Sequence, residues 1–381
     1  MKVRITSILI TALLLTLLLV GITQAAVPPL LPFNSTADLF VLDSGSGSIL
    51  RITPGGTVTV EVTKAQIEGV AGGVGGNYFG DNSIAFDADG TLYFVASVID
   101  ESAIFKRVPG GPLTMLASEL TLELDVGGDV DADGIAFGSD GLLYVSDDIG
   151  ERVLQVDPDT GTAFEYVTKA DFEALAGLTS ADMEVGIVGA SGGIIYVASE
   201  GTPNAIIAIA PDGTFILASG DPPFADLDVF MTRAANGDLI VADNSDADMI
   251  HRVTPAGVVS TFLSEAELEA VTGADVDLEG GIAFDCHGNF YVAESESDSI
   301  LKFDSSLNGS TWVSADDIAA VTGTAAELDG GIAFIIGPTL TPGVGGEFYP
   351  VNKPAVLVPW VALAAAIIAG GILLLRRRAD V

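Results

Sequence analysis

Alternating apolar and polar positions form a block that recurs through the middle of the chain. It reads SIAFDADGTLYFVAS at 83–97, GIAFGSDGLLYVSDD at 134–148, VGIVGASGGIIYVASE at 185–200 and GIAFDCHGNFYVAES at 281–295, with a divergent copy, MTRAANGDLIVADN, at 231–244. Each block holds two apolar runs separated by a turn pair such as Asp-Gly, Gly-Gly or Asn-Gly. This pattern predicts two antiparallel strands joined by a tight turn. Two half-blocks, DLFVLDS at 38–44 and GGIAFIIG at 330–337, stand at the two ends of the repeat region.

Further apolar runs extend each block to four strands. A third run follows the block, as in SILRIT at 48–53, AIFKRV at 103–108 and SILKFD at 299–304, and a weaker fourth run comes next, as in TVTVEV at 57–62 and VVSTFL at 258–263. Four antiparallel strands per repeat make the blade of a β-propeller. The sequence therefore predicts an all-β, six-bladed propeller over residues 36–337, in which the last half-block pairs with the strands that start at Asp38 and closes the ring.

Short helices are expected after the fourth strand in four blades. The four segments begin with Thr or Ser and carry an acid or amide three places later: Thr63 to Gln66, Thr168 to Asp171, Ser264 to Glu267 and Ser314 to Asp317. This spacing matches the capping box of a helix N-terminus, most closely where the third residue is Glu or Gln. We expect these helices to form a small amphipathic cover between blades.

The repeated GIAFDxxGxLYVAD-type blocks resemble those of the NHL, gluconolactonase and strictosidine-synthase-like group of six-bladed propellers. The resemblance covers about 300 residues, and it specifies the fold better than the function, because this architecture hosts both lactonases and binding modules. In the gluconolactonase-like enzymes, acidic and amide side chains hold a metal near the axis. Here Asn82 and Asn244 accompany the acids, but no single Glu-Asn-Asn-Asp set is evident.

The two ends of the chain read as addressing segments. Residues 1–26 predict a signal peptide, because Lys2 and Arg4 precede an apolar run and small residues follow it. An uncleaved N-terminal anchor is the alternative, since the apolar run is long.

The apolar run 355–375 is long enough to be a transmembrane helix, and Arg376 to Arg378 follow it directly. Positive residues stay on the cytoplasmic side, so we expect a single-pass membrane protein with the propeller outside, a Gly/Pro-rich spacer at 338–354 and a cytoplasmic tail at 376–381. The tail resembles the C-terminal sorting signals of prokaryotic surface proteins. It lacks an LPxTG or PEP motif, so we expect retention in the membrane.

Charge narrows the choice of partners. The chain has 52 Asp and Glu against 15 Lys and Arg, a formal net charge of −37. Such a surface repels phosphates, so no nucleic-acid partner is expected. It suits a cation, a basic protein or a polar small ligand. Solubility of an exported protein, or life at high salt, would explain the same composition without a ligand.

Acidic residues also recur at equivalent places in the blades. Six stand close to the start of the first strands and predict an axial ring: Asp81, Asp133, Glu184, Asp228, Glu279 and Asp329. Others follow the second strands and predict a rim: Asp43, Asp147, Asp243 and Glu294. Carboxylates around one axis repel one another unless a cation or proton intervenes, and hard oxygen ligands suit Ca²⁺, the one cofactor expected. The alternative is that these residues cap loops and turns.

The sequence offers little for nucleophilic catalysis. His251 and His287 are the only histidines, and Cys286 is the only cysteine. No phosphate-binding, dinucleotide-binding or zinc-binding spacing occurs. We therefore expect a cell-surface binding or scaffold module that uses an acidic face, and the alternative is a Ca²⁺-dependent hydrolase resembling gluconolactonases.

Overall fold

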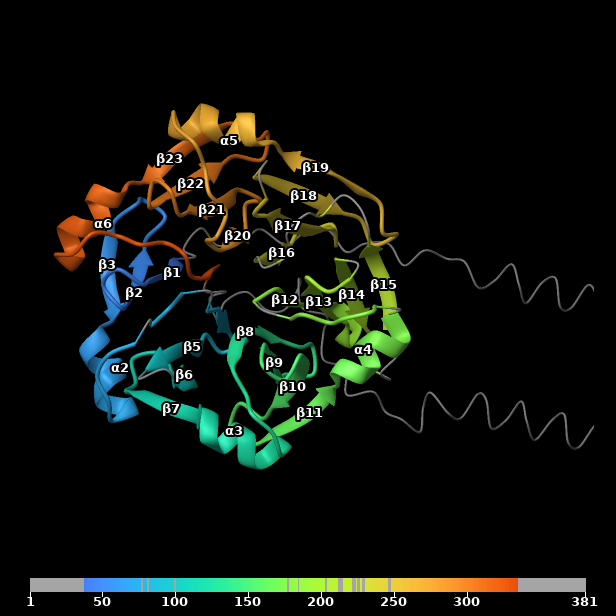
Figure 1. Cartoon of the computed structure of the whole chain (residues 1–381). Coiled ribbons are helices and arrows are strands. Elements are labelled where there is room, and N and C mark those ends of the chain that lie inside the picture. The colour runs from blue at the N-terminus through green and yellow to red at the C-terminus, as the bar shows by residue number, and fades with distance from the viewer. Residues whose placement is uncertain are drawn as a thin grey trace, which may run out of the picture. The chain divides into compact units, whose positions relative to one another are not determined.

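The computed structural model describes residues 38–334, apart from 77, 81, 99–100, 177, 184, 203, 212–214, 221–223, 225–226, 228–229 and 246–247. Six antiparallel sheets of four strands each surround a common axis in this part of the chain (Figure 1). This arrangement confirms the predicted six-bladed propeller.

The strands of each blade follow one another from the axis outward. Blade 1 consists of β24 (Ile332–Phe334), β1 (Leu39–Asp43), β2 (Ser48–Ile52) and β3 (Val58–Val62). Blade 2 consists of β4 (Ile84–Phe86), β5 (Leu92–Val98), β6 (Glu101–Arg107) and β7 (Leu113–Ser118). Blade 3 consists of β8 (Ala132–Phe137), β9 (Leu143–Asp147), β10 (Arg152–Val156) and β11 (Ala163–Val167).

The second half of the ring repeats this plan. Blade 4 consists of β12 (Ile187–Gly189), β13 (Ile195–Ser199), β14 (Ala205–Ile209) and β15 (Phe215–Gly220), with a short 3-10 turn, η1 (Ser191–Gly193), between its first two strands. Blade 5 consists of β16 (Met231–Arg233), β17 (Leu239–Asp243), β18 (Met249–Val253) and β19 (Val259–Leu263). Blade 6 consists of β20 (Ile282–Phe284), β21 (Phe290–Glu294), β22 (Ser299–Phe303) and β23 (Gly309–Val313).

Blade 1 closes the ring with both ends of the repeat region, as the half-blocks predicted. β24 pairs with β1 in antiparallel register, with Ala333 opposite Phe40. The ladder continues beyond the strand, where the amide of Leu42 donates to the carbonyl of Gly331 at 3.1 Å. Residues almost 300 positions apart in the sequence therefore form one sheet.

Aromatic side chains pack several blades against their neighbours. The ring of Phe40 in blade 1 lies edge-on to Phe86 of blade 2, with 4.9 Å between centroids. Tyr93 of blade 2 meets Phe137 of blade 3 in the same way at 5.0 Å. Such T-shaped pairs add about 0.5–1.5 kcal/mol to the area they bury. The core therefore lies between adjacent sheets, because the facing side chains of neighbouring blades pack against one another.

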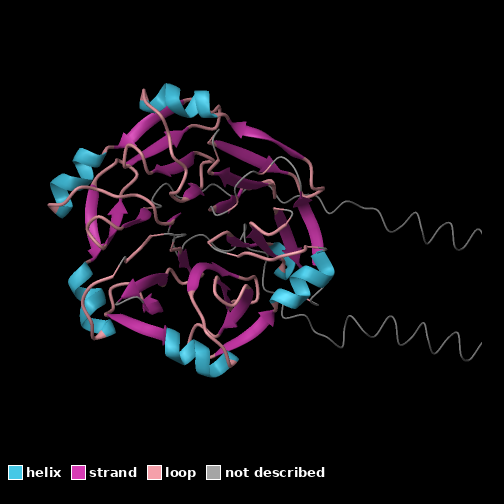
Figure 2. Cartoon of the chain, in the orientation of Figure 1, coloured by secondary structure: helices cyan, strands magenta, loops and turns pink. Residues whose placement is uncertain are grey.

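Helices lie at the perimeter of the described propeller (Figure 2). Their bounds are α2 (Lys64–Ala71), α3 (Glu119–Val126), α4 (Lys169–Ala176), α5 (Glu265–Thr272) and α6 (Ala315–Thr322). Four of the five are the predicted ones, and α3 was not predicted. Ser314 and Asp317 form a complete capping box, so an Asp at the third helical position performs this role as well as Glu267 does in α5.

Several predictions concern residues that the structure does not describe. The signal peptide at 1–26, the spacer at 338–354, the transmembrane helix at 355–375 and the tail at 376–381 all lie outside the described residues. Among the described helices, none is long and apolar enough to cross a membrane.

Candidate functional site

Antiparallel strands give the propeller two ends with different side chains. In blade 2, Val98 pairs with Glu101 at one end of the sheet and Leu92 pairs with Arg107 at the other. We call the first the acidic end: there the first strand of each blade begins, and the second strand turns into the third. The other is the opposite end.

Segments that lead into the first strands lie side by side around the axis at the acidic end. The amide of Gly281 donates to the carbonyl of Gly330 at 3.1 Å, and the amide of Gly331 donates to the carbonyl of Asn82 at 2.9 Å. The amide of Ser83 in turn donates to the carbonyl of Asp133 at 3.1 Å. Because these bonds link blades 6, 1, 2 and 3 in order, the side chains just before them belong to one ring.

Three of the six predicted axial acids fall within the described residues. Asp133 is half-buried and accepts a hydrogen bond from Nδ2 of Asn82 at 3.2 Å. Asp329 accepts one from Oγ of Ser44 at 2.6 Å, and burial raises the pKa of its carboxyl. Glu279 is exposed. The other three, Asp81, Glu184 and Asp228, lie outside the described residues, so the ring stays a prediction.

The predicted rim acids are buried and bound to the protein itself. Asp43 accepts a hydrogen bond from the amide of Glu327 at 3.1 Å. Glu294 accepts one from the amide of Asp277 at 3.0 Å. In blade 4, Oγ of Ser199 takes the equivalent bond from the amide of Asp182 at 3.2 Å. These side chains therefore hold the segment that leads into the first strand of their own blade.

Asp147 and Asp243 each contact a buried basic side chain as well. Asp147 accepts from the amide of Asp131 at 2.9 Å, and its other oxygen lies 2.6 Å from Nε of the buried Arg152. Asp243 contacts Nε2 of His251 at 3.1 Å, and both side chains are buried. Asp43, Asp147 and Glu294 thus anchor the segments that lead into the first strands of their own blades, and Asp243 is paired with His251.

A second set of acids, which the sequence analysis missed, connects neighbouring blades. Glu151 of blade 3 accepts a hydrogen bond from the amide of Met183 in blade 4 at 2.9 Å. Asp298 of blade 6 accepts one from the amide of Leu328 in blade 1 at 3.1 Å. Asp248 of blade 5 accepts one from the amide of Leu278 in blade 6. The sequence signal that could have identified them is an acid directly before the third strand of these three blades. We call this set the inter-blade carboxylates: Glu151, Asp248 and Asp298.

Burial and mutual repulsion raise the pKa values of these carboxyls. The pKa of Asp248 rises to about 7, first because burial disfavours its charge and then because Asp277 and Glu265 repel it. Burial likewise raises the pKa of Asp298 to about 6. The carboxamide of Asn244, with its nitrogen turned toward the acids, donates to Asp248 at 2.9 Å and to Asp277 at 3.0 Å. The acidic end therefore carries charge that its own donors only partly offset.

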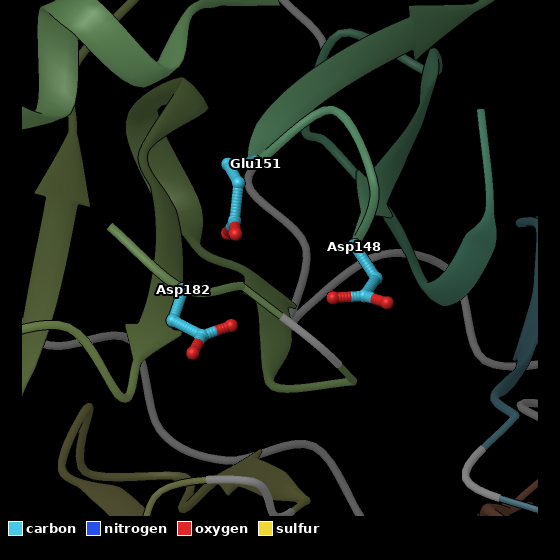
Figure 3. A group of neighbouring side chains, drawn as sticks. All are labelled: Asp148, Glu151 and Asp182. Carbon is cyan, nitrogen blue, oxygen red and sulfur yellow. The ribbon is translucent and has the colours of Figure 1, made fainter. Parts of the chain in front are cut away.

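Two groups of three carboxylates in the described part are close enough to share a cation. Figure 3 shows the first, Asp148, Glu151 and Asp182, which lies between blades 3 and 4. The second comprises Glu265, Glu269 and Asp275, on α5 and the loop after it. In each group the ligand oxygens lie within 4.8 Å of one another. Nζ of Lys169 lies 3.6 Å from Glu151 and offsets part of the charge in the first group.

Positive side chains gather at the opposite end. Nine Lys and Arg lie among the described residues, and six of them are near the ends of strands there: Arg51, Lys106, Arg107, Arg233, Arg252 and Lys302. The three at the acidic end already have partners, because Arg152 and Lys169 pair with acids and Lys64 lies over the ring of Tyr78. The described Lys and Arg are thus concentrated at the opposite end, and few of them lie among the carboxylates of the acidic end.

The histidines and the cysteine form no nucleophilic site in the described structure. Cys286 and His287 share a tight turn at the opposite end, with 3.4 Å between Sγ and Nδ1. Burial raises the pKa of the Cys286 thiol, which favours the unreactive protonated form. His251 is buried beside Asp243 and edge-on to Phe224.

Comparisons with known proteins support the fold. No protein-family model and no curated protein matches the chain. A structure of the nidogen/laminin complex aligns with a TM-score of 0.54 at 15% identity, covering 79% of this chain and 98% of that one. An inactive virginiamycin B lyase from Staphylococcus aureus with quinupristin gives 0.47 at 16% identity, covering 74% and 86%. A candidate gluconolactonase gives 0.41 at 14%, covering 61% and 76%. At these identities, the likeness shows the propeller fold alone.

Proposed function

We propose that this protein is a binding module whose acidic end takes up a cation or a basic polypeptide. The observation that carries the proposal is the uneven distribution of cations along the axis, since six of the nine described Lys and Arg lie at the opposite end. Solubility alone needs negative charge but not this distribution of the cations. A cation or a basic partner would gain from the summed field of such a surface.

The pKa values of the carboxyls also support the acidic end as the binding surface. Burial raises the pKa of Asp43, Asp131 and Asp329, which all lie at the acidic end. At the opposite end, hydrogen bonds from turn amides lower the pKa of Asp157 and Asp304. A positive ligand would favour the charged form of the first group, whose hydrogen bonds do not offset the effect of burial, whereas turn amides already favour the charged form of the second.

The setting of this module is also part of the proposal. Residues 1–26 direct export, and residues 355–375 anchor the chain in a membrane with Arg376 to Arg378 on the cytoplasmic side. The propeller would then face the exterior, where Ca²⁺ and basic proteins are available. These statements rest on the sequence pattern.

Titration of the full-length protein with CaCl₂ and, separately, with a lysine-rich peptide tests the proposal. A variant that carries Asp133→Asn, Glu279→Gln and Asp329→Asn should bind each probe at least about tenfold more weakly in calorimetry, because each substitution removes a charge near the axis. The matched control neutralises three acids at the opposite end: Asp89→Asn, Asp140→Asn and Asp159→Asn. Equal weakening by both triple variants would sink the proposal, since bulk charge alone would then explain binding.

One observation favours a second candidate, a metal-dependent hydrolase. Asn82 is 1% exposed, and its Oδ1 finds no hydrogen-bond donor within the described structure. Its carboxamide donates to Asp133, one of the predicted axial acids, at 3.2 Å. This fits a Ca²⁺ site in part, with Asn82 and Asp133 as holders of an ion that would polarise a substrate carbonyl and activate water. A lactone-hydrolysis screen with CaCl₂ present separates the candidates, because absence of turnover leaves only the binding module.

A further inference from the structure

The perimeter helices cover the outer strands of the propeller in a regular way. Each helix packs against the fourth strand of the following blade: α2 on β7, α3 on β11, α4 on β15, α5 on β23 and α6 on β3. In α3, Asp125 accepts a hydrogen bond from the amide of Ala163, the first residue of β11, at 2.9 Å. In α5, Val271 packs closely against Gly309, the first residue of β23. A Cβ added to Gly309 would clash with a methyl carbon of Val271.

Among the fourth strands of the six blades, β19 is the one against which no described helix packs in this way. Chain length explains why. Ten residues connect β15 to β16, whereas the other connections from an outer strand to the next inner strand have 13 to 21 residues. The connection must return across a four-stranded sheet, about 14 Å at the usual strand spacing. Ten residues therefore leave no room for an eight-residue helix as well.

The outer edge of β19 offers backbone groups without charged side chains. Its residues are Val259, Ser260, Thr261, Phe262 and Leu263. Val259 stands in the register position of Ala163 of β11, because each is paired with the last residue of the third strand. Since the amide of Ala163 points outward to Asp125, the amides of Val259 and Thr261 point outward too. Ser260 and Thr261 are exposed, and the preceding Val258 is 61% exposed. An edge that no described helix covers is a template for another strand.

We propose that the outer edge of β19 binds an extended segment of a partner polypeptide, which adds to blade 5 as a fifth, antiparallel strand and carries basic residues at its N-terminal end. Main-chain hydrogen bonds give affinity in this mode of recognition. The direction follows from charge, because Glu265, Glu267 and Glu269 of α5 come directly after β19. An antiparallel partner places its N-terminal residues beside these acids. A second copy of the chain fits poorly, since each copy has a net charge of −37.

The probe is a fluorescent peptide, Lys-Lys-Thr-Val-Thr-Val-Thr, added to the full-length protein and followed by anisotropy. Thr261→Pro removes an outward amide and is compatible with an edge strand, so it should weaken binding at least about tenfold. Thr311→Pro is the matched control, because Thr311 has the same register and exposure in β23, whose edge α5 covers. It should leave binding unchanged, and moving the lysines to the C-terminal end of the peptide should weaken it.

Hydrogen exchange on the unsubstituted protein keeps the test independent of whether the proline variant folds. Peptide addition should slow exchange in residues 258–263 and leave β23 unchanged. Protection elsewhere, equal binding by the two proline variants, or no saturable binding overturns the proposal. Sedimentation gives the remaining arm: a dimer of the full-length protein that Thr261→Pro dissociates would show that a second copy occupies the edge instead. These outcomes do not depend on the axial acids, so the proposal stands or falls separately from the proposed function.

Discussion

Single carboxylates at the acidic end have two different physical roles. Some anchor the chain, as Asp147 does by accepting from the amides of Asp131 and Gly150 and by pairing with Arg152. Others, such as Glu279, are exposed at the surface. The distinction matters because the sequence places both kinds in equivalent repeats, and only burial and hydrogen bonds separate them.

Asp147→Ala should therefore affect stability rather than binding. Asp147 is fully buried and Arg152 is 8% exposed, so the substitution leaves Nε of a buried guanidinium and two amides without their acceptor. Breaking a buried pair from one side costs about 3–5 kcal/mol. Urea unfolding at pH 7 measures the loss. Asp159→Ala is the control, because its contact with Lys106 is at the surface and should be worth about 0–1 kcal/mol. Similar losses in the two variants would contradict the anchoring role.

The inter-blade carboxylate Asp248 should make stability depend on pH. Its pKa is about 7 in the folded protein and near 4 in the unfolded chain. The folded state therefore binds a proton more tightly, so this contribution is present below pH 4 and is lost as pH rises to about 7. Asp248→Asn can still accept from the amide of Leu278 but carries no charge. Its thermal unfolding temperature should exceed that of the unsubstituted protein at pH 8, and the two should converge near pH 4.

The control variant, at Asp304, should change the unfolding temperature at pH 8 in the opposite direction. Hydrogen bonds from Asn308 and from the amide of Ser306 lower the pKa of Asp304, so its charged form stabilises the fold above its ordinary pKa. Asp304→Asn should therefore lower the unfolding temperature at pH 8. If Asp248→Asn also lowered it, burial and the repulsion by Asp277 and Glu265 would not be the dominant influences on that carboxyl.

At the scale of elements, short sequence patterns predicted the strands and most of the helices, because neighbouring residues determine where these elements begin and end. The strands appeared from apolar alternation within about two residues of their bounds. Four helices appeared from their capping spacing, and Thr168 and Asp171 confirm it with hydrogen bonds of 3.0 and 3.2 Å in both directions. The helix α3 was not predicted because Thr121, at its third position, is neither acid nor amide. Oγ of Ser118 nevertheless caps the helix by accepting from the amide of Thr121 at 3.2 Å. Only half of the expected signature was present.

Contacts between elements were harder to predict than the elements themselves. The repeat aligned the axial acids, because every blade leads into its first strand in the same way. It did not show that Glu151 and Asp298 reach the following blade, since that depends on turn geometry: both have positive φ, 48° and 49°. The sequence likewise did not show that the rim acids are buried, because alternation assigns a face but not the packing of the neighbouring blade.

At the scale of the whole molecule, closure of the ring rests on one non-covalent ladder. Within blade 6, a tight turn at 285–289 connects β20 to β21, so the two strands stay close even when their pairing weakens. β24 has no such connection to β1, and 288 residues separate Asp43 from Ile332. Bringing such distant segments together has an entropic cost that only the β24–β1 contacts offset. Blade 1 should therefore be the place where the ring opens first.

Ala333→Pro tests this weak point. The amide of Leu42 donates to Gly331, so two residues further along the antiparallel ladder Ala333 donates to Phe40, and proline removes that donor. An unsatisfied buried carbonyl costs about 1–3 kcal/mol. Ala283→Pro is the matched control, because Ala283 faces Tyr291 at the same place in blade 6. Hydrogen exchange should accelerate throughout β1 and β24 in Ala333→Pro but only within β20 and β21 in Ala283→Pro. The unfolding free energy should fall further in the first variant, because loss of closure frees both ends of the ring, whereas equal losses would show that closure adds nothing beyond the local ladder.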